Sequence, residues 1–355
     1  MSTNLDDWRS RINDLDNQLL NLLNQRAEAA LRIGDLKRRK DLAYFVPERE
    51  AEIVDRLVKD NGGPLPAAAV RAIWREVLSA SLALERPLRV AYLGPVATFT
   101  HQAALQRFGS LAEFQPARTI LDVFEDVERN RAEYGVVPVE NSTEGAVNLT
   151  LDRLIDSDVL LCGELRLEVA QHLLSRAPDL HQVKTVCSHP QALAQCRAWL
   201  AAHLPDVAVE EVASTAAAAA LAAQEPTVGA VASELAARLY DVPVLRPRIE
   251  DSANNSTRFL VIGRRAMGPT GRDKTSILFS MRNEPGALVR ILEPFAAERL
   301  NLTKIESRPT KRQPWEYVMF VDFDGHRDTS AVAAVLAQIR EHALFFKILG
   351  SYPAA

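Results

Sequence analysis

Cysteine is scarce in this chain of 355 residues, and its three copies show no evident pairing. Cys162, Cys187 and Cys196 lack CxxC spacing, which argues against a structural metal site and favours a reducing compartment. No apolar run approaches membrane-spanning length, and the N-terminus lacks a cationic start followed by an apolar segment. We therefore expect a cytoplasmic protein without metal, cofactor or membrane partner.

An excess of charge of either sign is also missing. The chain has 42 Lys and Arg against 46 Asp and Glu, which gives a net charge of −4. This balance argues against a general nucleic-acid-binding protein. The hydrophobic content of 47% is ordinary for a soluble protein, and the length is sufficient for two or three domains, each with its own core.

Three patterns follow one another along the chain. Residues 5–85 have helical periodicity, and a helix start is expected at Pro47, where acidic residues follow proline. From residue 89, short β-rich runs alternate with helices, which argues for an α/β unit with mainly parallel strands. In this unit we expect strands at 89–93, 134–139, 183–187 and 228–232, and helices at 100–108, 149–155, 191–200, 215–223 and 234–239.

A third unit follows the glycine-containing stretch 263–272, which is typical of a linker. Its expected elements follow the βαββαβ order of a ferredoxin-like α+β fold. They are strand 274–281, helix 286–299, strand 302–309, strand 316–323, helix 329–341 and strand 344–350.

Cations interrupt the apolar stripe of the first helix. At about 100° per residue, Arg26 and Lys37 lie about 20° apart on the face that also carries the apolar stripe residues. Arg9 extends this face toward the N-terminus. The stripe consists of Ile12, Leu15, Leu19, Leu22 and Ile33. Cations on a core-facing stripe are costly unless an anion meets them, although long basic side chains can also lay their stems on apolar surface.

The helix expected at 66–86 shows a matching irregularity. Its apolar series Val70, Ile73 and Val77 continues into Ser81 and Glu85, where further core residues would be expected. Polar groups on both helices favour an anion-binding pocket over two unrelated surface features.

These residues resemble the active-site set of the all-helical chorismate mutases, which form an intertwined dimer. The resemblance implies that Arg26 and, from the other chain, Arg9 bind the two carboxylates of chorismate. It places Lys37 and Glu85 beside the ether oxygen. It assigns the substrate hydroxyl to Glu50 and an additional contact with a substrate carboxylate to Ser81. The rearrangement needs no nucleophile, because holding one conformer and stabilising charge at the ether oxygen carry the rate.

Two positions depart from relatives. Glu85 stands where some relatives have Gln, and a carboxyl group donates a hydrogen bond to an ether oxygen only when it is protonated. Burial beside a dianion is expected to raise its pKa. Val46 stands where some relatives have Asp, so one substrate contact is expected to be absent.

The middle segment resembles prephenate dehydratase over about 88–266. Four local motifs occur in that family's order, namely Gly94-Pro95 with Ala97-Thr98-Phe99-Thr100, Val139-Glu140-Asn141-Ser142-Thr143-Glu144-Gly145, Ser188-His189-Pro190-Gln191 with Gln195, and Thr257-Arg258-Phe259. Each motif alone is weak, since Thr-Arg-Phe could simply begin a strand and Ser188 could cap a helix. Together they are specific.

The resemblance places Thr257 nearest the hydroxyl that leaves prephenate. A threonine hydroxyl is a very weak acid, so we expect it to position or relay a proton while aromatisation drives the loss of carbon dioxide and hydroxide. The further polar contacts are expected to be Asn141, Ser142, Ser188 and Gln195. Glu140 either supports the loop or takes part in the site. His189 is a candidate general acid, because free histidine side chains titrate near neutral pH, but a structural role at the turn before Pro190 is equally open.

The third segment resembles the ACT domain, a small ligand-binding domain. Gly286-Ala287-Leu288-Val289 and Glu306-Ser307-Arg308-Pro309 match its two motifs. The resemblance implies allosteric binding of phenylalanine between two such domains, with Gly286, Ala287, Leu288, Glu306, Ser307 and Arg308 as contacts. The glycine permits close backbone approach, and a helix N-terminus suits a carboxylate. Alternatively, Glu306 and Arg308 form only a surface ion pair.

The resemblance covers nearly the whole chain, with a mutase domain at 1–87, a two-lobed dehydratase domain at 88–266 and a regulatory domain at 272–355. It implies a homodimer that converts chorismate to prephenate, and prephenate to phenylpyruvate, under feedback inhibition by phenylalanine. Two alternatives remain: a dehydratase whose helices serve only for dimerisation, and a non-catalytic amino-acid sensor.

Overall fold

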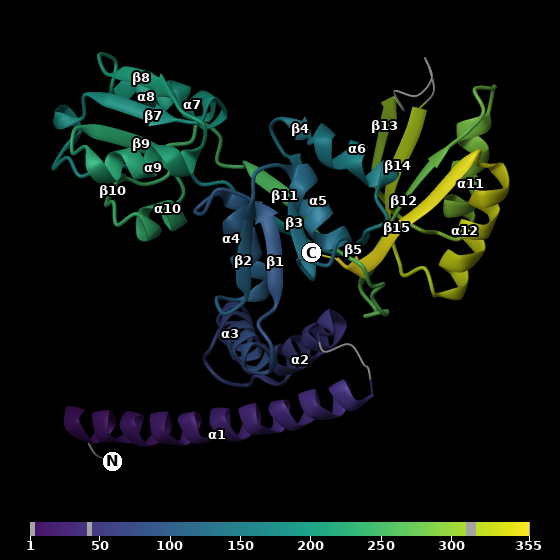
Figure 1. The fold of residues 1–355 in the computed structure, drawn as a ribbon, viewed down its shortest axis with the longest axis horizontal. Helices are drawn as coiled ribbons and strands as arrows, with labels where there is room; N and C mark the ends of the chain where they lie inside the picture. The colour runs from purple at the N-terminus through teal and green to yellow at the C-terminus, as the bar shows by residue number, and fades with distance from the viewer. Residues whose placement is uncertain (1–3, 41–44, 310–316, 355) are drawn as a thin grey trace. The chain divides into compact units, whose positions relative to one another are not determined.

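A computed structural model describes residues 4–40, 45–309 and 317–354, and it divides the chain into two compact units (Figure 1). The first unit contains residues 1–88 and 108–113, and the second contains residues 89–107 and 114–355. Residue 316, expected to begin a strand, lies outside the described ranges.

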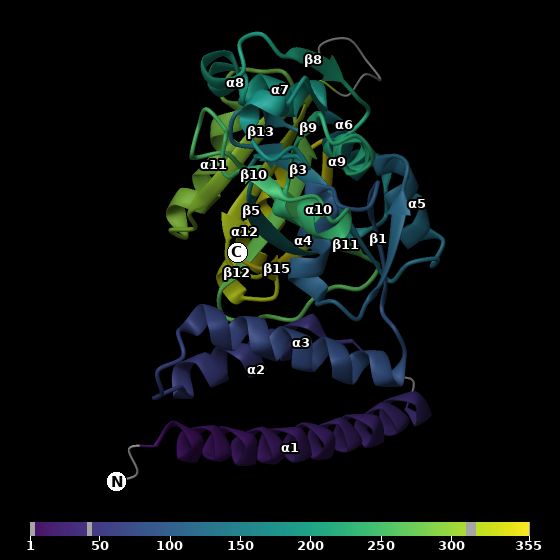
Figure 2. The same ribbon diagram turned by 90° about the vertical axis from the view of Figure 1, so that its left-hand side faces the viewer.

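The first unit is built on the helices α1 (Leu5–Arg39), α2 (Pro47–Asp60) and α3 (Ala67–Glu85). Figure 2 shows α2 and α3 side by side, and α3 also packs on α1. The Asn4 side chain caps α1 by accepting from the backbone N–H of Asp6, and Pro47 begins α2 as the sequence predicted. The helical reading of this segment is confirmed.

The apolar stripe of α1 is not buried within the chain. Its five apolar members are between 42% and 60% exposed. Gly34 is the buried residue of this helix. The expectation that the stripe faces a core is therefore wrong for one copy of the chain, which leaves α1 with a long uncovered apolar face.

The second unit begins with a lobe, here called the first lobe, that consists of one mixed sheet and three helices. The sheet order is β2-β1-β3-β11-β5, with β4 paired to β3. Its strands are β1 (Arg89–Leu93), β2 (Glu113–Ala117), β3 (Tyr134–Asn141), β4 (Gly145–Ala146), β5 (Leu160–Glu168) and β11 (Ser256–Gly263). The helices are α4 (Phe99–Phe108), α5 (Ile120–Glu128) and α6 (Asn148–Asp156).

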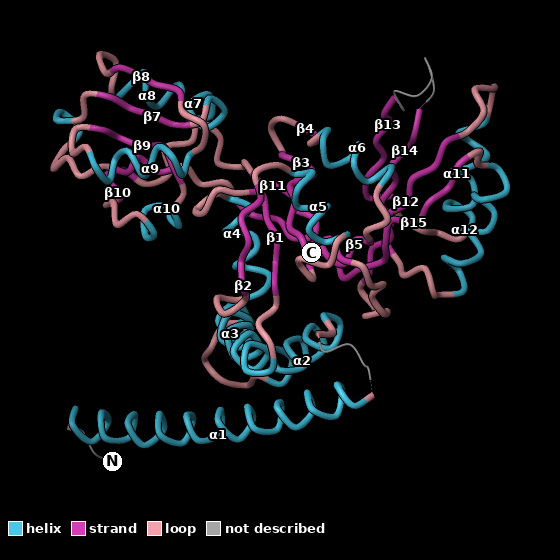
Figure 3. The backbone as a smooth tube through the Cα atoms, in the orientation of Figure 1, coloured by secondary structure: helices cyan, strands magenta, loops and turns pink. Residues whose placement is uncertain are grey.

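The second lobe lies between β5 and β11 in sequence and has its own sheet, in the order β10-β6-β9-β7-β8 (Figure 3). Its strands are β6 (His172–Leu174), β7 (Thr185–Ser188), β8 (Ala208–Glu211), β9 (Val228–Ala232) and β10 (Val244–Arg246). Its helices are η1 (Leu180–Gln182), α7 (Pro190–Gln195), α8 (Arg197–His203), α9 (Thr215–Gln224) and α10 (Glu234–Leu239).

The expected alternation of strands and helices is confirmed, and the four predicted strands pair in parallel, but both sheets are mixed because of strands that were not predicted. β1 pairs with β3 in parallel, and β7 pairs in parallel with both β8 and β9. β11, however, pairs antiparallel with both β3 and β5, and β6 pairs antiparallel with β9 and β10. The physical reason is that β11 returns from the second lobe and enters the first sheet between two strands made earlier in the chain.

The C-terminal part of the second unit has the predicted βαββαβ order. Its antiparallel sheet runs β13-β14-β12-β15, the ferredoxin-like arrangement. The strands are β12 (Asp273–Ser280), β13 (Leu302–Pro309), β14 (Tyr317–Asp324) and β15 (Phe345–Pro353). The helices α11 (Ala287–Ala297) and α12 (Ser330–His342) supply the core with buried residues such as Phe295 and Ile339.

Cys162, Cys187 and Cys196 are free and buried. Within residues 4–40, 45–309 and 317–354, no helix combines the length and apolar character needed to cross a membrane.

Candidate active sites

The first candidate site lies between α1 and α3. Arg26 Nη1 donates a hydrogen bond to Ser81 Oγ at 2.5 Å, and that hydroxyl donates to the carbonyl oxygen of Val77. The guanidinium carbon of Arg26 lies 5.6 Å from the centre of the Trp74 ring. Burial lowers the pKa of Arg26, while the nearby Glu50 opposes this shift. Three of the predicted residues, Arg26, Ser81 and Glu50, are thus brought together in one chain.

Glu85 lies at the same helix pair, against Gly34. Burial raises the pKa of Glu85, and the cations Lys37 and Arg38 work against that shift. A Cβ atom at position 34 would lie 2.3 Å from Oε2 of Glu85, so the absence of a side chain at Gly34 makes room for this carboxyl group. The structure therefore adds Gly34, which the sequence analysis did not identify, to the predicted pair Lys37 and Glu85.

Arg9 is not brought to this cluster. It is exposed near the start of α1 and forms a 3.3 Å ion pair with Asp6. At 1.5 Å per residue, Arg9 lies about 25 Å along the helix from Arg26. Val46 is the N-cap residue of α2 and provides no side-chain hydrogen bond there.

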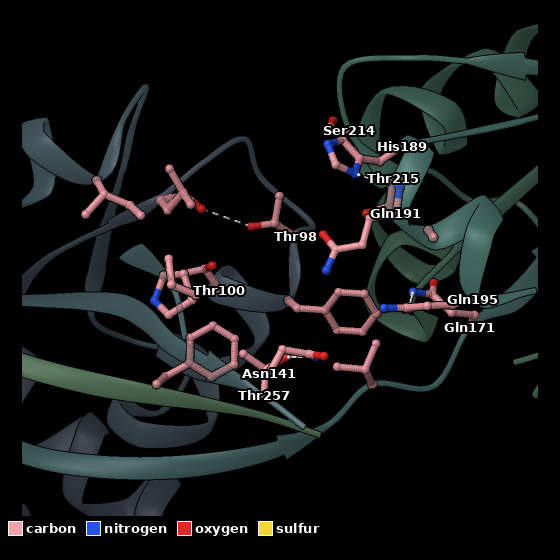
Figure 4. A pocket seen from close by; sticks show the side chains of 18 residues that line it. Thr98, Thr100, Asn141, Gln171, His189, Gln191, Gln195, Ser214, Thr215 and Thr257 are labelled. Atoms are coloured by element: carbon pink, nitrogen blue, oxygen red, sulfur yellow. Dashed lines mark hydrogen bonds between the residues drawn. The ribbon is translucent and has the colours of Figure 1, made fainter. Parts of the chain in front are cut away.

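The second candidate site is a cavity of about 350 Å³ lined by both lobes of the second unit (Figure 4). From the first lobe, Thr98, Thr100, Asn141 and Thr257 line it. The polar side chains on the other side are Gln171, His189, Gln191, Gln195, Ser214 and Thr215. No Lys, Arg, Asp or Glu belongs to the lining among the described residues, so hydroxyl, amide and imidazole groups supply its polar side chains.

Hydrogen bonds fix the polar groups of the first lobe. Asn141 Nδ2 donates to Thr257 Oγ1 at 2.9 Å and to Asn255 Oδ1 at 2.9 Å. Asn141 Oδ1 accepts from the backbone N–H of Thr143 at 3.0 Å and of Glu144 at 3.2 Å. Asn141 is therefore held in one orientation by the loop that follows β3.

A series of side-chain hydrogen bonds links the two lobes. Gln171 Nε2 donates to Gln195 Oε1 at 3.2 Å, and Gln195 Nε2 donates to Glu144 Oε1 at 3.3 Å. Gln171 Oε1 is buried without a hydrogen-bond partner in the structure. An unpartnered buried acceptor beside a cavity can receive a hydrogen bond from a ligand.

Two helices direct their first turns to the cavity. Thr98 and Thr100 flank the start of α4, and Ser214 with Thr215 stands at the start of α9. The Ser214 hydroxyl accepts from the backbone N–H of Ala217. Helix N-termini stabilise anions through unpaired N–H groups and the helix dipole.

The Ser-His-Pro-Gln motif has a different local role from the one expected. Ser188 is buried at the end of β7 and donates to the carbonyl oxygen of Val231 at 2.6 Å. His189, not Ser188, is the N-cap of α7, where its Nδ1 accepts from the backbone N–H of Gln191. The helix-capping interpretation of Ser188 is therefore wrong. His189 both caps a helix and lines the cavity.

Two other predicted residues lie outside the cavity lining. Ser142 Oγ accepts from the backbone N–H of Ser256 and donates to the carbonyl oxygen of Asn254, so it joins the loops before β11 and after β3. Glu140 forms a 2.9 Å ion pair with Lys304. The structure thus gives Ser142 and Glu140 supporting contacts.

The predicted regulatory residues occupy two elements of the C-terminal fold. Gly286 is the N-cap of α11 with φ +78°, a conformation that favours glycine. Ala287 lines a cavity of about 280 Å³, whereas Leu288 packs on the core. Glu306 and Ser307 lie on β13 beside Arg308.

The alternative of a surface pair between Glu306 and Arg308 is wrong. Arg308 is buried, and its Nη2 lies 2.6 Å from Asp152 Oδ1 of α6, while Nη1 donates to the side chain of Asn148. The sequence could not show this, because the partner residues lie more than 150 positions earlier.

Family models match three consecutive segments of the chain. They are chorismate mutase type II over residues 8–86, prephenate dehydratase over 90–267 and the ACT domain over 275–341. A curated relative from Aquifex aeolicus, the bifunctional chorismate mutase/prephenate dehydratase, is 50% identical over 99% of this chain and 98% of its own. The chain belongs to the bifunctional chorismate mutase/prephenate dehydratase family. It is an enzyme of both the isomerase and the lyase class.

Solved structures agree with this assignment for the second unit. A prephenate dehydratase from Arthrobacter aurescens in complex with L-Phe is 34% identical, with a TM-score of 0.69, and the match covers 75% of this chain and 90% of that one. A structure described as a novel type of quorum quenching acylase, GqqA, is 28% identical with a TM-score of 0.69, over 75% of this chain and 98% of that one. Because one fold can support different activities, site residues must carry the functional argument.

Proposed function

We propose that the chain catalyses two consecutive reactions, with residue roles that follow from the two candidate sites. The mutase site isomerises chorismate, and the dehydratase site converts the prephenate so formed to phenylpyruvate, carbon dioxide and water. The match of a mutase model to residues 8–86 disfavours both a purely dimerising helical unit and a non-catalytic sensor. The observation that carries the proposal is the hydrogen-bonded pair Asn141 and Thr257 within a cavity between two helix N-termini.

In the mutase site, Arg26 binds one carboxylate of chorismate, and Ser81 fixes the guanidinium through their hydrogen bond. Lys37 and protonated Glu85 stabilise the charge that develops on the ether oxygen. Glu50 accepts from the substrate hydroxyl. Arg26 and Lys37 come from the C-terminal half of α1, Ser81 and Glu85 come from the end of α3, and α2 adds Glu50.

In the dehydratase site, the first turns of α4 and α9 supply donors for the two carboxylates of prephenate. Thr257 hydrogen-bonds to the leaving hydroxyl and positions or relays the proton with which it departs as water. The hydrogen bond from Asn141 Nδ2 to Thr257 Oγ1 supports this role, because it occupies an oxygen lone pair and directs the threonine hydroxyl group. Gln195 orients the substrate, while Ser142, Ser188 and Glu140 support the surrounding backbone.

The C-terminal domain binds phenylalanine and inhibits dehydration. Support comes from the ACT match and from the relative solved with L-Phe. Gly286, Ala287 and Leu288 offer a helix start for the carboxylate of the amino acid. Glu306, Ser307 and Arg308 complete the site on β13.

The active form is a homodimer in the cytoplasm, with neither metal nor cofactor. The exposed apolar stripe of α1 supports dimerisation, because a monomer rarely leaves such a continuous apolar face in water. In that dimer, Arg9 of one chain completes the pocket of the other and binds the second carboxylate. The three domains extend over residues 1–87, 88–266 and 272–355.

A coupled assay tests this function. The full chain is supplied with chorismate, and prephenate and phenylpyruvate are followed separately with and without phenylalanine. We expect both products to form in order, and phenylalanine to reduce phenylpyruvate alone. Formation of phenylpyruvate from prephenate without any turnover of chorismate would contradict the mutase assignment.

A further inference from the structure

Two ion pairs lie directly behind the Asn141 and Thr257 side chains. In the antiparallel pairing of β3 with β11, Thr257 is opposite Asn141, and Arg258 is opposite Glu140. Successive residues of a strand point to opposite faces of the sheet. Asn141 and Thr257 line the cavity, whereas neither Glu140 nor Arg258 does. The face behind the site is therefore formed by charged side chains.

Arg258 is held on three sides. Its side chain is 8% exposed, and its Nε lies 2.6 Å from Glu164 Oε2, while Nη1 lies 2.6 Å from Asp322 Oδ2. Its Nη2 donates to Tyr352 Oη at 3.2 Å. Burial alone would lower the pKa of Arg258, but Asp322, Tyr352 and Glu164 outweigh it and raise the pKa. Arg258 is therefore charged and fixed in position.

Glu140 is held by a second cation. Lys304 Nζ lies 2.9 Å from Glu140 Oε2, and Arg258 Nη1 lies 4.0 Å from the same oxygen. Lys304 is 12% exposed, whereas Glu140 is 39% exposed. Glu140 at the end of β3 and Arg258 at the start of β11 thus form ion pairs on the face opposite to the cavity.

Most partners of these two residues belong to the ACT sheet. β13, β14 and β15 contribute the partners Lys304, Asp322 and Tyr352, and β12 adds Lys274, which pairs with Glu164. Lys274 Nζ lies 2.5 Å from Glu164 Oε1, and Ser276 Oγ donates to Asp322 Oδ1 at 2.6 Å. The cluster balances three cations with three anions. The cations are Arg258, Lys274 and Lys304, and the anions are Glu140, Glu164 and Asp322.

Such a cluster is better suited to fix geometry than to add stability. Desolvation offsets much of the attraction within buried ion pairs, so their net contribution to the free energy of unfolding is small. Their geometric demands are strict, however, since a displaced partner leaves a buried charge unpaired. A shift of the ACT sheet would consequently displace Arg258 and Glu140, each of which is adjacent in sequence to a residue that lines the cavity.

We infer that Arg258 and Glu140 are positioning residues of the dehydratase site, and that the ACT sheet, through Asp322 and Lys304, sets the placement of Thr257 and Asn141. This inference rests on the proposed dehydratase function. It implies that the ACT sheet is needed for full dehydratase turnover even when no phenylalanine is bound.

The test compares Lys304→Met and Glu140→Gln with wild type in the full chain, using prephenate as substrate. Lys304→Met keeps the apolar stem and removes the charge. Both variants are expected to lower kcat for dehydration about 10-fold or more, since small misplacements of reacting groups reduce turnover by up to about 100-fold. KM is expected to change little, and mutase turnover of the same samples is expected to stay at the wild-type value.

Three further variants separate positioning from general damage. Lys304→Arg restores the charge and should restore most of kcat. The double variant Lys304→Met, Glu140→Gln should be no slower than either single variant, because both remove the same ion pair. Asp322→Asn should lower kcat, whereas Asp324→Asn, two residues along β14 and bonded to Asn301 outside the cluster, should not.

The outcomes are distinguishable. Wild type that fails to dehydrate prephenate would remove the proposed function together with the inference. Wild type that is active, with Lys304→Met and Glu140→Gln at the same kcat, would overturn the inference alone. Equal losses in Asp322→Asn and Asp324→Asn, or additive losses in the double variant, would also overturn it.

Discussion

Asn141 Nδ2 lies 2.9 Å from Thr257 Oγ1 and donates a hydrogen bond to it across the paired strands β3 and β11. The threonine oxygen is therefore an acceptor within the protein, which leaves its own proton available to the cavity. The hydrogen bond fixes the two side chains relative to each other, and we propose that Asn141 orients the Thr257 hydroxyl for contact with the substrate.

Replacement of Thr257 by Ala is expected to reduce dehydration by about 100-fold or more, the range associated with loss of a positioned proton donor. Mutase turnover should be retained, because Thr257 belongs to the second unit. Separate assays on chorismate and prephenate check this result. Thr257→Ser, which keeps the hydroxyl, is the matched control. Dehydratase turnover by Thr257→Ala near the wild-type rate would remove Thr257 from the mechanism.

The sequence was sufficient to predict Asn141, Thr257 and Gln195 as neighbours, because the motifs that carry them occur together in one family. It was not sufficient for Gln171, Ser214 and Thr215, which line the same cavity but stand in no motif that we recognised. They lie near Asn141 and Thr257 because the two lobes meet at the cavity, and local sequence periodicity does not reveal such an arrangement. Thr98 and Thr100 had a signal, since they lie within the first motif.

The fold, like the site, could be predicted from the sequence only in part. Local pattern predicted the βαββαβ unit and the helix at Pro47, because those elements depend on neighbouring residues. The antiparallel insertion of β11 between β3 and β5 depends on contacts more than 90 residues apart, such as Arg258 with Glu164, and was missed. The exposed stripe of α1 was predicted to face a core for a related reason, since an apolar helix face has the same periodicity whether or not the chain itself covers it.

Mutase turnover is expected to fall as pH rises, because Glu85 must be protonated to donate to the ether oxygen. Burial raises the pKa of Glu85, so the protonated form persists to higher pH than for an ordinary glutamate, and activity is lost as pH rises through that pKa. Above it, the rate should decline about tenfold per pH unit. Glu85→Gln should flatten the profile. A wild-type rate that is constant with pH would exclude this role.

Gly34→Ala is expected to reduce mutase turnover about 10- to 100-fold without affecting dehydration. The added Cβ would lie 2.3 Å from Oε2 of Glu85 and would displace that carboxyl group. Alanine favours a helix over glycine by about 1 kcal/mol, so a weaker helix would not explain the loss. Gly62→Ala is the control, since no atom lies within 4 Å of a Cβ there. Equal mutase rates in both variants would show that Glu85 tolerates the displacement.

Arg9 should act on the active site of the partner chain. Arg9→Ala and Arg26→Ala are each expected to be inactive as mutases, whereas coexpression of both should restore about a quarter of wild-type activity. Half of the dimers are then mixed, and one of their two sites combines an intact Arg26 with the partner chain's intact arginine at position 9. Turnover of the purified mixture measures this. A mixture without activity would place both arginines of a site in one chain.

Glu306→Ala is expected to blunt inhibition of dehydration by phenylalanine while leaving uninhibited turnover unchanged. The side chain of Glu306 shares a face of β13 with Lys304 and Arg308, and a carboxylate there can pair with the ammonium group of an amino acid. Loss of one charged hydrogen bond corresponds to an increase of roughly 10-fold in the phenylalanine concentration needed for half inhibition. Glu298→Ala, at the exposed end of α11, is the control. If Glu306→Ala retains the wild-type inhibition curve, the phenylalanine site lies elsewhere on the ACT fold.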